Sequence, residues 1–480
     1  MAVTPRPGWV ILASSLPMFM VALNNLVVTN ALPEIGQSLD TDVAGLQWVV
    51  NGYVLAFAGL LLTGAALGDR YGRRLVFVGG IVLFSLGSIA CALSDSTVTL
   101  VLARVVQGMG AAAVQPLSLT LLSAAVPPHR RSAAIGLWGG VNGLGIALGP
   151  LIGGAVTEGI AWQWIFWINL PVGMVAIPLV FWAVRETKGA DRGLDLPGVL
   201  LVTGAVTTAV LAIVRAGDDG WASPRILGLV AAAVVLAVLF VVWEQRAASP
   251  LLPLGFYRIR AFVLTNLVSL AMFFGVFGGI FFLAQFMQGP MGFAPLEAGL
   301  RTLPWTAAPM IVAPLAGLIT DRVGGGRLMA LGLLLQGGAL GWIALMARID
   351  LPYAHLVPPL ILAGIGMGLA LAPATAVVLG AVSPQEHGKA SGATNTIREV
   401  GGALGVAVLT TVFRGPLRTT TIWSPVDYAH AFVAGMTPAT LVGVAVILAG
   451  SIIALFIPRS PPKPAAVLTE PAVGKERAPL

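Results

Sequence analysis

Fourteen long apolar runs constrain this chain more than any other feature of its sequence. Each run is close to or above the length of about 20 residues that an α-helix needs to cross the hydrocarbon core of a bilayer. Charged residues make up 10% of the 480 residues, whereas soluble domains carry about 25%. We therefore expect an all-α polytopic membrane protein with 14 transmembrane helices. The runs cover residues 9–32, 46–67, 75–93, 98–122, 132–156, 162–184, 196–214, 226–243, 262–286, 300–319, 328–346, 355–379, 393–413 and 432–457.

The distribution of Lys and Arg predicts how these spans are oriented. Most of the 27 basic residues lie on the same side of the membrane as loop 68–74, and basic loops stay in the cytoplasm. An even number of spans then places both the N- and the C-terminus in the cytoplasm, in a multi-pass protein of the cytoplasmic (inner) membrane. The net charge of +7 comes from these loops, so it indicates topology and not a nucleic-acid partner.

One pattern occurs twice in the sequence. Residues 317–327 repeat the pattern of residues 64–74: a Gly at the end of a span, then Asp-Arg, a Gly two residues on and a further Arg. Two parallel halves are a common transporter plan, with the substrate site between them near the midplane. We expect an N-terminal six-helix half, two extra transmembrane helices, a C-terminal six-helix half and a disordered cytoplasmic tail. Their ranges are 1–190, 191–258, 259–460 and 461–480.

Four motifs resemble those of a known transporter family. Residues 64–74, Gly-Ala-Ala-Leu-Gly-Asp-Arg-Tyr-Gly-Arg-Arg, resemble the loop 2–3 signature of the major facilitator superfamily. Residues 102–112 resemble its span-4 signature, residues 143–154 the span-5 signature typical of antiporters, and residues 162–171 the aromatic entry to span 6. With fourteen spans, the chain is similar to the drug:proton antiporter family of QacA/EmrB-like multidrug efflux transporters.

This resemblance implies a fold and a function. It implies the major facilitator fold and a secondary active transporter, not an enzyme. Such a protein exports hydrophobic or cationic drugs and other toxic compounds by alternating access, coupled to proton influx, and so supports antibiotic resistance. The expected partners are a small-molecule drug, the proton and the lipid bilayer. No cofactor is expected, and the chain is expected to be a monomer.

The charged loop and one intramembrane arginine are the predicted conformational switch. Asp69 lies near the start of span 3, where a carboxylate suits the helix dipole, and three arginines are close enough to pair with it: Arg70, Arg73 and Arg74. Such a cluster either latches helix ends in one state and releases them in the other, or serves only as a topological anchor. Arg104 lies inside span 4, where a charge is costly. The resemblance implies that Arg104 couples protonation to the transport cycle; a snorkelling arginine near the outer interface is the alternative.

The chain departs from the family at the position of a protonatable acid. The family pattern near the end of span 1 has Asp where this chain has Asn24, and Asn releases no proton in this pH range. Coupling has moved to another carboxylate, or it is lost, or the chain was altered to mimic a protonated Asp. The best substitute is Glu399, early in span 13, because a carboxyl group shielded from water suits a proton carrier. A simple ion pair between Glu399 and Arg398 is the alternative.

Amide and aromatic side chains within the spans are candidates for lining the substrate cavity. Side chains of these kinds also pack between helices, so the alternative role for each candidate is packing against a neighbouring helix. The candidates are Asn25, Gln115, Trp138, Asn142, Phe281, Gln285 and Asn395.

Span 5 contains a predicted packing seam and hinge. Glycines four residues apart let a neighbouring helix approach closely, and a proline removes one helix hydrogen bond and allows a kink. The seam consists of Gly145, Gly149, Pro150, Gly153 and Gly154. The glycine spacing also resembles a dinucleotide-binding loop, but no strand precedes it.

The sequence argues against metal and nucleotide chemistry. No two of the four histidines are at metal-ligand spacing, Cys91 is the single cysteine, and no Gly-x-x-x-x-Gly-Lys-Ser/Thr motif is present. The energy for transport would come from an ion gradient or from the concentration gradient of the substrate itself. Two alternatives to drug export are an exporter of a specific endogenous metabolite or lipid, with proton coupling weakened by Asn24, and a non-transporting membrane sensor. The sensor would need a soluble signalling domain, for which no segment outside the spans is long enough.

Overall fold

The computed structural model describes residues 7–41, 43–127, 130–159, 161–189, 195–247, 250–417 and 424–458. Within these ranges the chain is helical and contains no strand, which confirms the all-α expectation. The α-helices are α1 (Pro7–Ser38), α2 (Val43–Tyr71), α3 (Arg73–Ala92), α4 (Thr97–Ala125), α5 (Arg131–Gly159), α6 (Trp164–Trp167), α7 (Asn169–Ala183), α8 (Leu196–Asp219), α9 (Pro224–Glu244), α10 (Arg260–Gln288), α11 (Pro295–Val323), α12 (Gly325–Met346), α13 (Val357–Gly380), α14 (His387–Leu417) and α15 (Pro425–Leu455). Three short 3-10 helices are η2 (Leu254–Arg258), η3 (Tyr353–His355) and η4 (Pro384–Glu386).

Twelve stretches of the described residues are long and apolar enough to cross a membrane. Nine of them lie on single long helices. The other three join α6 to α7, η3 to α13 and η4 to α14. Helices α1 and α5, which contain 32 and 29 residues, cover two of the predicted apolar runs. They are not among the twelve, so the count of fourteen spans stays a prediction.

The repeated sequence motif folds into the same turn twice. α2 and α3 are separated by Gly72, whose φ is 122°, and α11 and α12 are separated by Gly324, whose φ is 95°. Glycine adopts such positive φ angles without the steric cost that a side chain would add. Each glycine therefore lets one helix end and the next begin within a single residue, and the sequence repeat is also a repeat of backbone structure.

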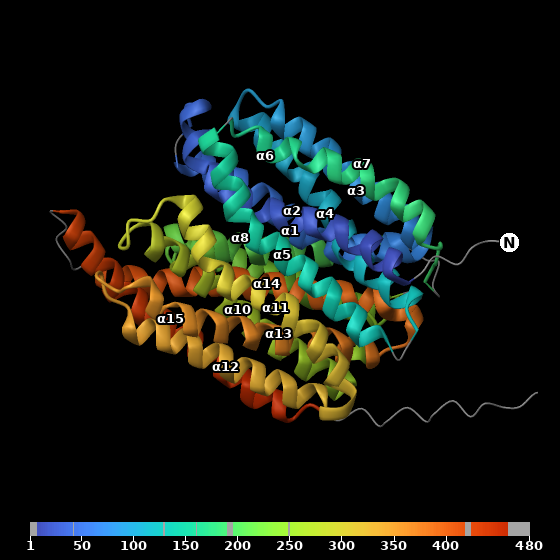
Figure 1. Ribbon diagram of the computed structural model, residues 1–480. Coiled ribbons are helices and arrows are strands. Elements are labelled where there is room, and N and C mark those ends of the chain that lie inside the picture. The colour runs from blue at the N-terminus through green and yellow to red at the C-terminus, as the bar shows by residue number, and fades with distance from the viewer. Residues whose placement is uncertain are drawn as a thin grey trace, which may run out of the picture.

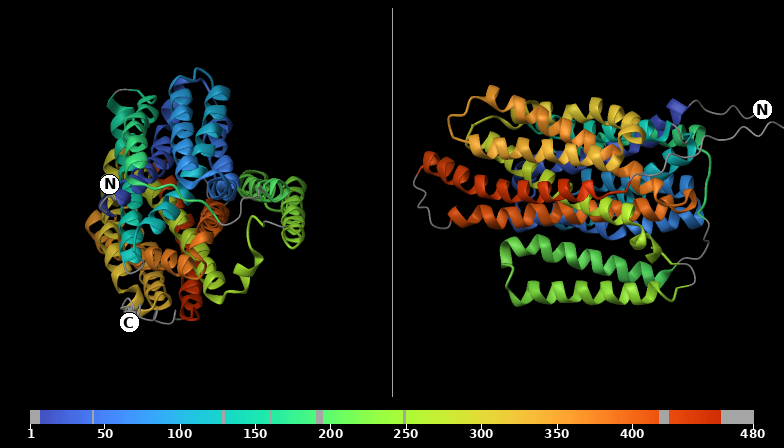
Figure 2. Two further views of the ribbon diagram at one scale, coloured as in Figure 1. Left: turned by 90° about the vertical axis from the view of Figure 1, so that its right-hand side faces the viewer. Right: turned by 90° about the horizontal axis from the view of Figure 1, so that it is seen from below.

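The helices form two bundles with a hairpin at their side. Helices α1–α7 make the upper bundle in Figure 1 and α10–α15 the lower one. The green pair in Figure 2, α8 and α9, lies along one flank of both. α8 packs against α9, α2 and α14, whereas α9 packs mainly against α8. Many apolar side chains of α9 are exposed, as suits a helix that faces lipid.

Each bundle has its own apolar core. Phe77, Phe84 and Leu117 belong to a buried cluster within α1–α7, and Phe282 and Leu340 belong to a larger one within α10–α15. The two bundles are therefore packed units in their own right, and the contacts between them form a separate interface.

The bundles touch at the end of the molecule where α2 meets α3, which we call the Asp69 end. There α5 crosses α11 so closely that a Cβ on Gly136 would lie 2.6 Å from the carbonyl oxygen of Ala313. An apolar cluster also brings Trp138 of α5 against Leu379 of α13. The start of α1 and the end of α15 lie at this same end (Figure 2).

Candidate functional site

A network of buried polar side chains in the first bundle centres on Arg104 of α4. This side chain is 1% exposed. Its Nη1 donates to Oε1 of Gln107 at 2.6 Å, and its Nε donates to the carbonyl oxygen of Val49 at 3.2 Å. The guanidinium carbon lies 4.3 Å from the centre of the Tyr53 ring. Arg104 is therefore held inside the bundle and does not extend to the outer interface.

Gln107 connects this arginine to three further helices. Its Nε2 donates to Oδ1 of Asn24 on α1 at 3.1 Å and to Oγ of Ser88 on α3 at 2.7 Å. Oγ of Ser88 also accepts a hydrogen bond from Nδ2 of Asn169 on α7 at 3.2 Å. Residues three apart share a face of a helix, so the meeting of Arg104 and Gln107 follows from the sequence. No sequence spacing connects Ser88 or Asn169 with them, and only the fold brings these side chains together.

This buried network contains no carboxylate. A buried arginine usually needs an acidic partner, but no ion pair between described residues involves Arg104. Neutral oxygens and an aromatic face take the place of the acid. Nδ2 of Asn24 and the hydroxyl of Tyr53 are buried without a hydrogen-bond partner in the described part of the chain. An acid at position 24 would be linked to the guanidinium of Arg104 by two hydrogen bonds through Gln107. Asn24 is neutral, so it supplies no negative charge to balance this arginine.

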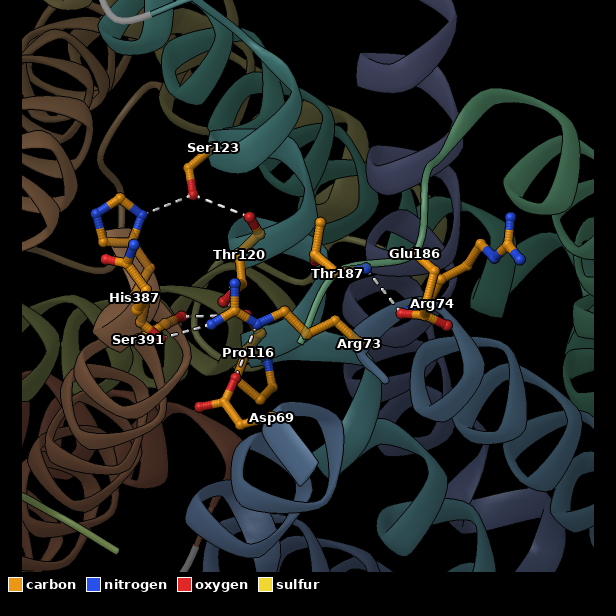
Figure 3. Close-up of polar contacts among 11 residues, drawn as sticks. Asp69, Arg73, Arg74, Pro116, Thr120, Ser123, Glu186, Thr187, His387 and Ser391 are labelled. Atoms are coloured by element: carbon orange, nitrogen blue, oxygen red, sulfur yellow. Dashed lines mark hydrogen bonds and ion pairs between the residues drawn. The ribbon is translucent and has the colours of Figure 1, made fainter. Parts of the chain in front are cut away.

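The charged loop joins the two bundles at the Asp69 end (Figure 3). Asp69 and Arg73 are buried, at 4% and 3% exposure. Nε of Arg73 donates to Oδ1 of Asp69 at 2.7 Å, and Nη2 donates to the carbonyl oxygen of Gln385 at 2.8 Å. Gln385 lies in η4, the short helix that directly precedes α14 in the other bundle. The planar guanidinium offers several donors at fixed angles, so one arginine holds an acid of its own bundle and a carbonyl group of the other.

Two more polar contacts cross the same interface. Oγ of Ser123 on α4 and Nδ1 of His387 on α14 lie 3.1 Å apart, and Oγ of Ser391 donates to the carbonyl oxygen of Pro116 at 3.3 Å (Figure 3). The first turns of α14 are thus bonded to α4, while η4 just before them is bonded to the charged loop. We call the contacts that Arg73, Ser123 and Pro116 make with residues 385–391 the end latch.

The latch depends on a glycine, and it engages one of the two repeats. A Cβ on Gly388 would lie 2.8 Å from each carboxylate oxygen of Asp69, so the missing side chain allows α14 to approach α2.

The corresponding residues of the second repeat, Asp321, Arg322 and Arg327, are exposed and form no ion pair with another described residue. The two bundles are therefore alike in backbone but differ in how their charged loops are used.

Glu186, which no sequence motif marks, binds the start of α3. Its Oε1 accepts a hydrogen bond from the backbone N–H of Arg74 at 2.9 Å, and its Oε2 accepts one from that of Leu75 at 3.1 Å. The first N–H groups of a helix lack partners within the helix and favour a negative charge. Arg70 makes a different contact from Arg73: its guanidinium carbon lies 5.1 Å from the ring centre of Tyr71.

The second bundle has a buried arginine of its own. Arg398 is 3% exposed, its Nη2 donates to Oγ1 of Thr375 at 3.0 Å, and its guanidinium carbon lies 5.5 Å from the ring centre of Phe273. Glu399 is partly buried and forms neither an ion pair nor a hydrogen bond with the described residues. Successive residues of a helix point about 100° apart, so these two neighbours interact electrostatically but do not form the close ion pair that was the alternative to a proton-carrier role.

A small cavity lies beside Arg398 at the interface of the bundles. Its volume is ≈ 10 Å³, the space of about one water molecule. Leu119 of α4 lines one side, while Thr375, Asn395 and Arg398 line the other. Nδ2 of Asn395 donates to Oγ of Ser391 at 3.4 Å. A drug-sized compound has no room here while the Asp69 end is closed.

The other predicted cavity residues are spread over four helices, α1, α4, α5 and α10. Nε1 of Trp138 donates to Oγ of Ser118 at 2.6 Å within an apolar cluster, which is a packing role in this state. Gln115 on α4 is buried and Asn142 on α5 is half-buried. On α10, Nε2 of Gln285 donates to the carbonyl oxygen of Phe281 at 3.4 Å, near the surface. The side chain of Asn25 lies outside what the structure describes.

The predicted seam in α5 packs against α1. A Cβ on Gly145 would lie 2.8 Å from the carbonyl oxygen of Phe19, so the helices approach closely at this glycine. Gly149 and Gly153 are also buried. The ring of Pro150 and the surroundings of Gly154 lie outside the described part, and α5 runs as one helix through both positions.

Known proteins resemble this chain along most of its length. The profile of the family described as Major Facilitator Superfamily matches residues 15–406. The tetracenomycin C resistance and export protein of Streptomyces glaucescens is 36% identical over 407 residues, which are 84% of this chain and 75% of that protein. The multidrug resistance protein Stp of Mycobacterium tuberculosis is 37% identical over 412 residues, 85% of this chain and 76% of that one. The puromycin resistance protein pur8 of Streptomyces alboniger is 34% identical over 465 residues, 94% and 91% of the two chains.

A solved structure shares the fold. The crystal structure of the human organic anion transporter MFSD10 (TETRAN) superposes with a TM-score of 0.65, covering 94% of this chain and 100% of that chain. The two sequences are 16% identical, so this likeness bears on the fold alone.

Proposed function

Because the chain belongs to the major facilitator superfamily, whose members are transporters and not enzymes, we propose that it exports hydrophobic or cationic drugs by alternating access, in exchange for protons. The cargo would bind between the two bundles near the membrane midplane. The relatives support a drug as cargo, since they are named for resistance to tetracenomycin C, to several drugs and to puromycin.

The observation that carries this proposal is the end latch. Its contacts are a few polar bonds between two separately packed bundles, and such contacts can break without disturbing either core. An exporter needs to open at the cytoplasmic side to take up cargo and to close there before release. Reversible bonding of Arg73 to the carbonyl oxygen of Gln385 is suited to this step.

We propose the following topology for the exporter. Helices α1 and α5 complete fourteen spans, since their 32 and 29 residues exceed the roughly 20 that a span needs. The halves are residues 1–190 and 259–460, with the extra pair in 191–258 and a cytoplasmic tail in 461–480. The Asp69 end and both termini face the cytoplasm, because most basic residues lie on that side. The protein acts as a monomer in the cytoplasmic (inner) membrane.

Glu399 is the proposed proton carrier. Asn24 has no proton to give, and the network around Arg104 contains no acid among the described residues. Glu399 lies on a membrane helix, is partly buried and is not bound to Arg398. A carboxylate that no close ion pair or hydrogen bond occupies in the described part of the chain is free to bind either a proton or a cationic cargo, and competition between the two is the simplest basis for exchange.

A second candidate is an exporter of one endogenous metabolite or lipid with weak proton coupling. The observation that favours it is Asn24, whose Oδ1 accepts from Gln107 where the family has an acid. A transporter driven mainly by the gradient of its own cargo would need no titrating group at that place.

Efflux from proteoliposomes distinguishes these proposals. Rhodamine 6G, a hydrophobic cation, would be loaded and its release followed with and without an imposed pH gradient. The proteins compared are the unchanged chain, Glu399→Gln, Asn24→Asp and the matched control Asp350→Asn, which removes an acid that is paired with Arg348 at the surface.

We expect gradient-driven efflux by the unchanged chain and by Asp350→Asn, and none by Glu399→Gln. Gradient-driven efflux by Asn24→Asp alone would contradict proton coupling in the unchanged chain. Absence of dye transport by all four proteins would contradict multidrug export and favour the single-cargo exporter.

A further inference from the structure

We propose that a groove between the start of α10 and the end of α15 binds one anionic phospholipid. The groove has a volume of ≈ 360 Å³ and lies at the Asp69 end of the second bundle. Arg258 and Arg260 line one part of it, and Val263, Leu264 and Ile453 line the rest. It is separate from the end latch and from the cavity beside Arg398.

Among the described residues, no acid pairs with the arginines of the groove. Both are exposed, and neither forms an ion pair, a hydrogen bond or a ring contact with any residue that the structure describes. Ile259 precedes α10 and offers no side-chain cap to its first N–H groups. The open N–H groups of a helix start attract anions, so they add to the pull of the two guanidinium groups. This part of the groove is suited to a phosphate group.

The remainder of the groove is apolar. Val263 and Leu264 follow Arg260 by three and four residues, so they lie on the same face of α10, one turn further into the membrane. Ile453 on α15 and Phe456, the 65% exposed residue that directly follows this helix, form the opposite wall. Tyr257 also lines the groove, and the amphipathic ring of a tyrosine suits the level of the lipid headgroups.

The groove has positive charge at one part and apolar walls deeper in the membrane, and this combination matches a phospholipid and not a free phosphate ion. A free ion would use only the arginines, and the apolar walls would stay uncovered. An anionic headgroup is preferred over a zwitterionic one because the latter brings its own cation to two unpaired arginines. Basic pockets between helices on the cytoplasmic side of membrane proteins bind anionic lipids in this way.

Retention of lipid by the purified protein tests the proposal. The full chain in detergent would be mixed with phosphatidylglycerol, phosphatidylcholine or inorganic phosphate, and both bound lipid and melting temperature would be measured. The variants are Arg258→Gln/Arg260→Gln and Phe456→Ser. The control is Arg246→Gln, which changes an exposed arginine outside the groove.

We expect one retained phosphatidylglycerol, and a raised melting temperature, for the unchanged chain and for Arg246→Gln. The double arginine variant should bind phosphatidylglycerol about 30-fold more weakly, since each basic residue near an anionic headgroup contributes about fivefold. Phe456→Ser should also weaken lipid binding, and equal melting temperatures in phosphatidylcholine would show that both variants are folded. Equal retention of both lipids, unchanged binding by the double variant, or the same stabilisation by inorganic phosphate would overturn the proposal.

Discussion

Arg73 of the first bundle donates to the backbone of Gln385 in the second, at 2.8 Å, while the same guanidinium binds Asp69 at 2.7 Å. A side chain that is 3% exposed thus bridges two units with separate cores. Because its partner across the interface is a carbonyl group, this contact depends on the position of α14 and not on the identity of residue 385.

Removing the bridging arginine should open the Asp69 end. Arg73→Ala deletes a charge-assisted hydrogen bond and leaves Asp69 without its arginine, and bonds of this kind contribute about 1.5–3 kcal/mol. The reporter is a cysteine introduced by Thr394→Cys, at a buried site of the cavity beside Arg398. We expect this cysteine to react about tenfold faster with a water-soluble thiol reagent in Arg73→Ala than in the protein that keeps Arg73. All of these proteins also carry Cys91→Ser, so that the introduced cysteine is the only thiol. Arg322→Ala, in the unengaged repeat, should leave the rate unchanged, and equal rates in both variants would count against the latch.

Adding one methyl group at the latch should have a similar effect. The Cβ of Gly388→Ala would lie 2.8 Å from both carboxylate oxygens of Asp69, and overpacking costs about 1–3 kcal/mol. Gly380→Ala is the matched control, because nothing lies within 4 Å of a Cβ at that position. We expect Gly388→Ala to shift the protein towards the state open at this end and to slow dye efflux, with Gly380→Ala unchanged. Normal efflux by Gly388→Ala would show that the close approach is not needed.

The network around Arg104 should tolerate an acid better than an apolar residue. Gln107→Leu removes the acceptor of Arg104 and the donor to Asn24 and Ser88, and each buried group left unpaired costs about 1–3 kcal/mol. Gln107→Glu keeps an oxygen at 2.6 Å from Nη1 and adds the missing negative charge. We expect a much lower melting temperature for Gln107→Leu than for Gln107→Glu. The reverse order would mean that Arg104 is stabilised by its apolar surroundings and not by this hydrogen bond.

Glu186 should stabilise the start of α3 locally. Glu186→Ala removes acceptors from the N–H groups of Arg74 and Leu75, and a negative charge at a helix start contributes about 0.3–1 kcal/mol. Hydrogen exchange of these two amides should become faster, while that of the α3 interior stays the same. Asp350→Ala, which removes an exposed acid paired with Arg348 between α12 and α13, serves as the control. No change in exchange would mean that the loop geometry alone protects these amides.

The sequence predicted the parts of this structure that depend on local pattern. Apolar runs fixed the helices, and the repeated Asp-Arg-x-Gly pattern placed Gly72 and Gly324 in equivalent turns. The pairing of Asp69 with Arg73 also followed from their spacing of four residues, and burial of Arg104 followed from its place within an apolar run.

The contacts that could not be predicted come from distant parts of the chain. Arg73 binds a carbonyl group 312 positions away, and backbone carbonyls carry no signal in the sequence. Ser88 and Glu186 are common residue types whose roles appear only when other helices approach them. Adjacency in sequence made an ion pair of Glu399 with Arg398 the alternative to a proton-carrier role, but a helix turns consecutive side chains apart.

Distances at the two ends of the molecule test the central claim most directly. One pair of spin labels would replace exposed residues Ala125 and Val323 at the Asp69 end, and a second pair Leu93 and Leu345 at the opposite end, each in the Cys91→Ser background. Double electron–electron resonance would measure the distance within each pair in liposomes, with and without rhodamine 6G. Alternating access predicts that lengthening of the first distance accompanies shortening of the second. Two distances that never change, or that lengthen together, would contradict it.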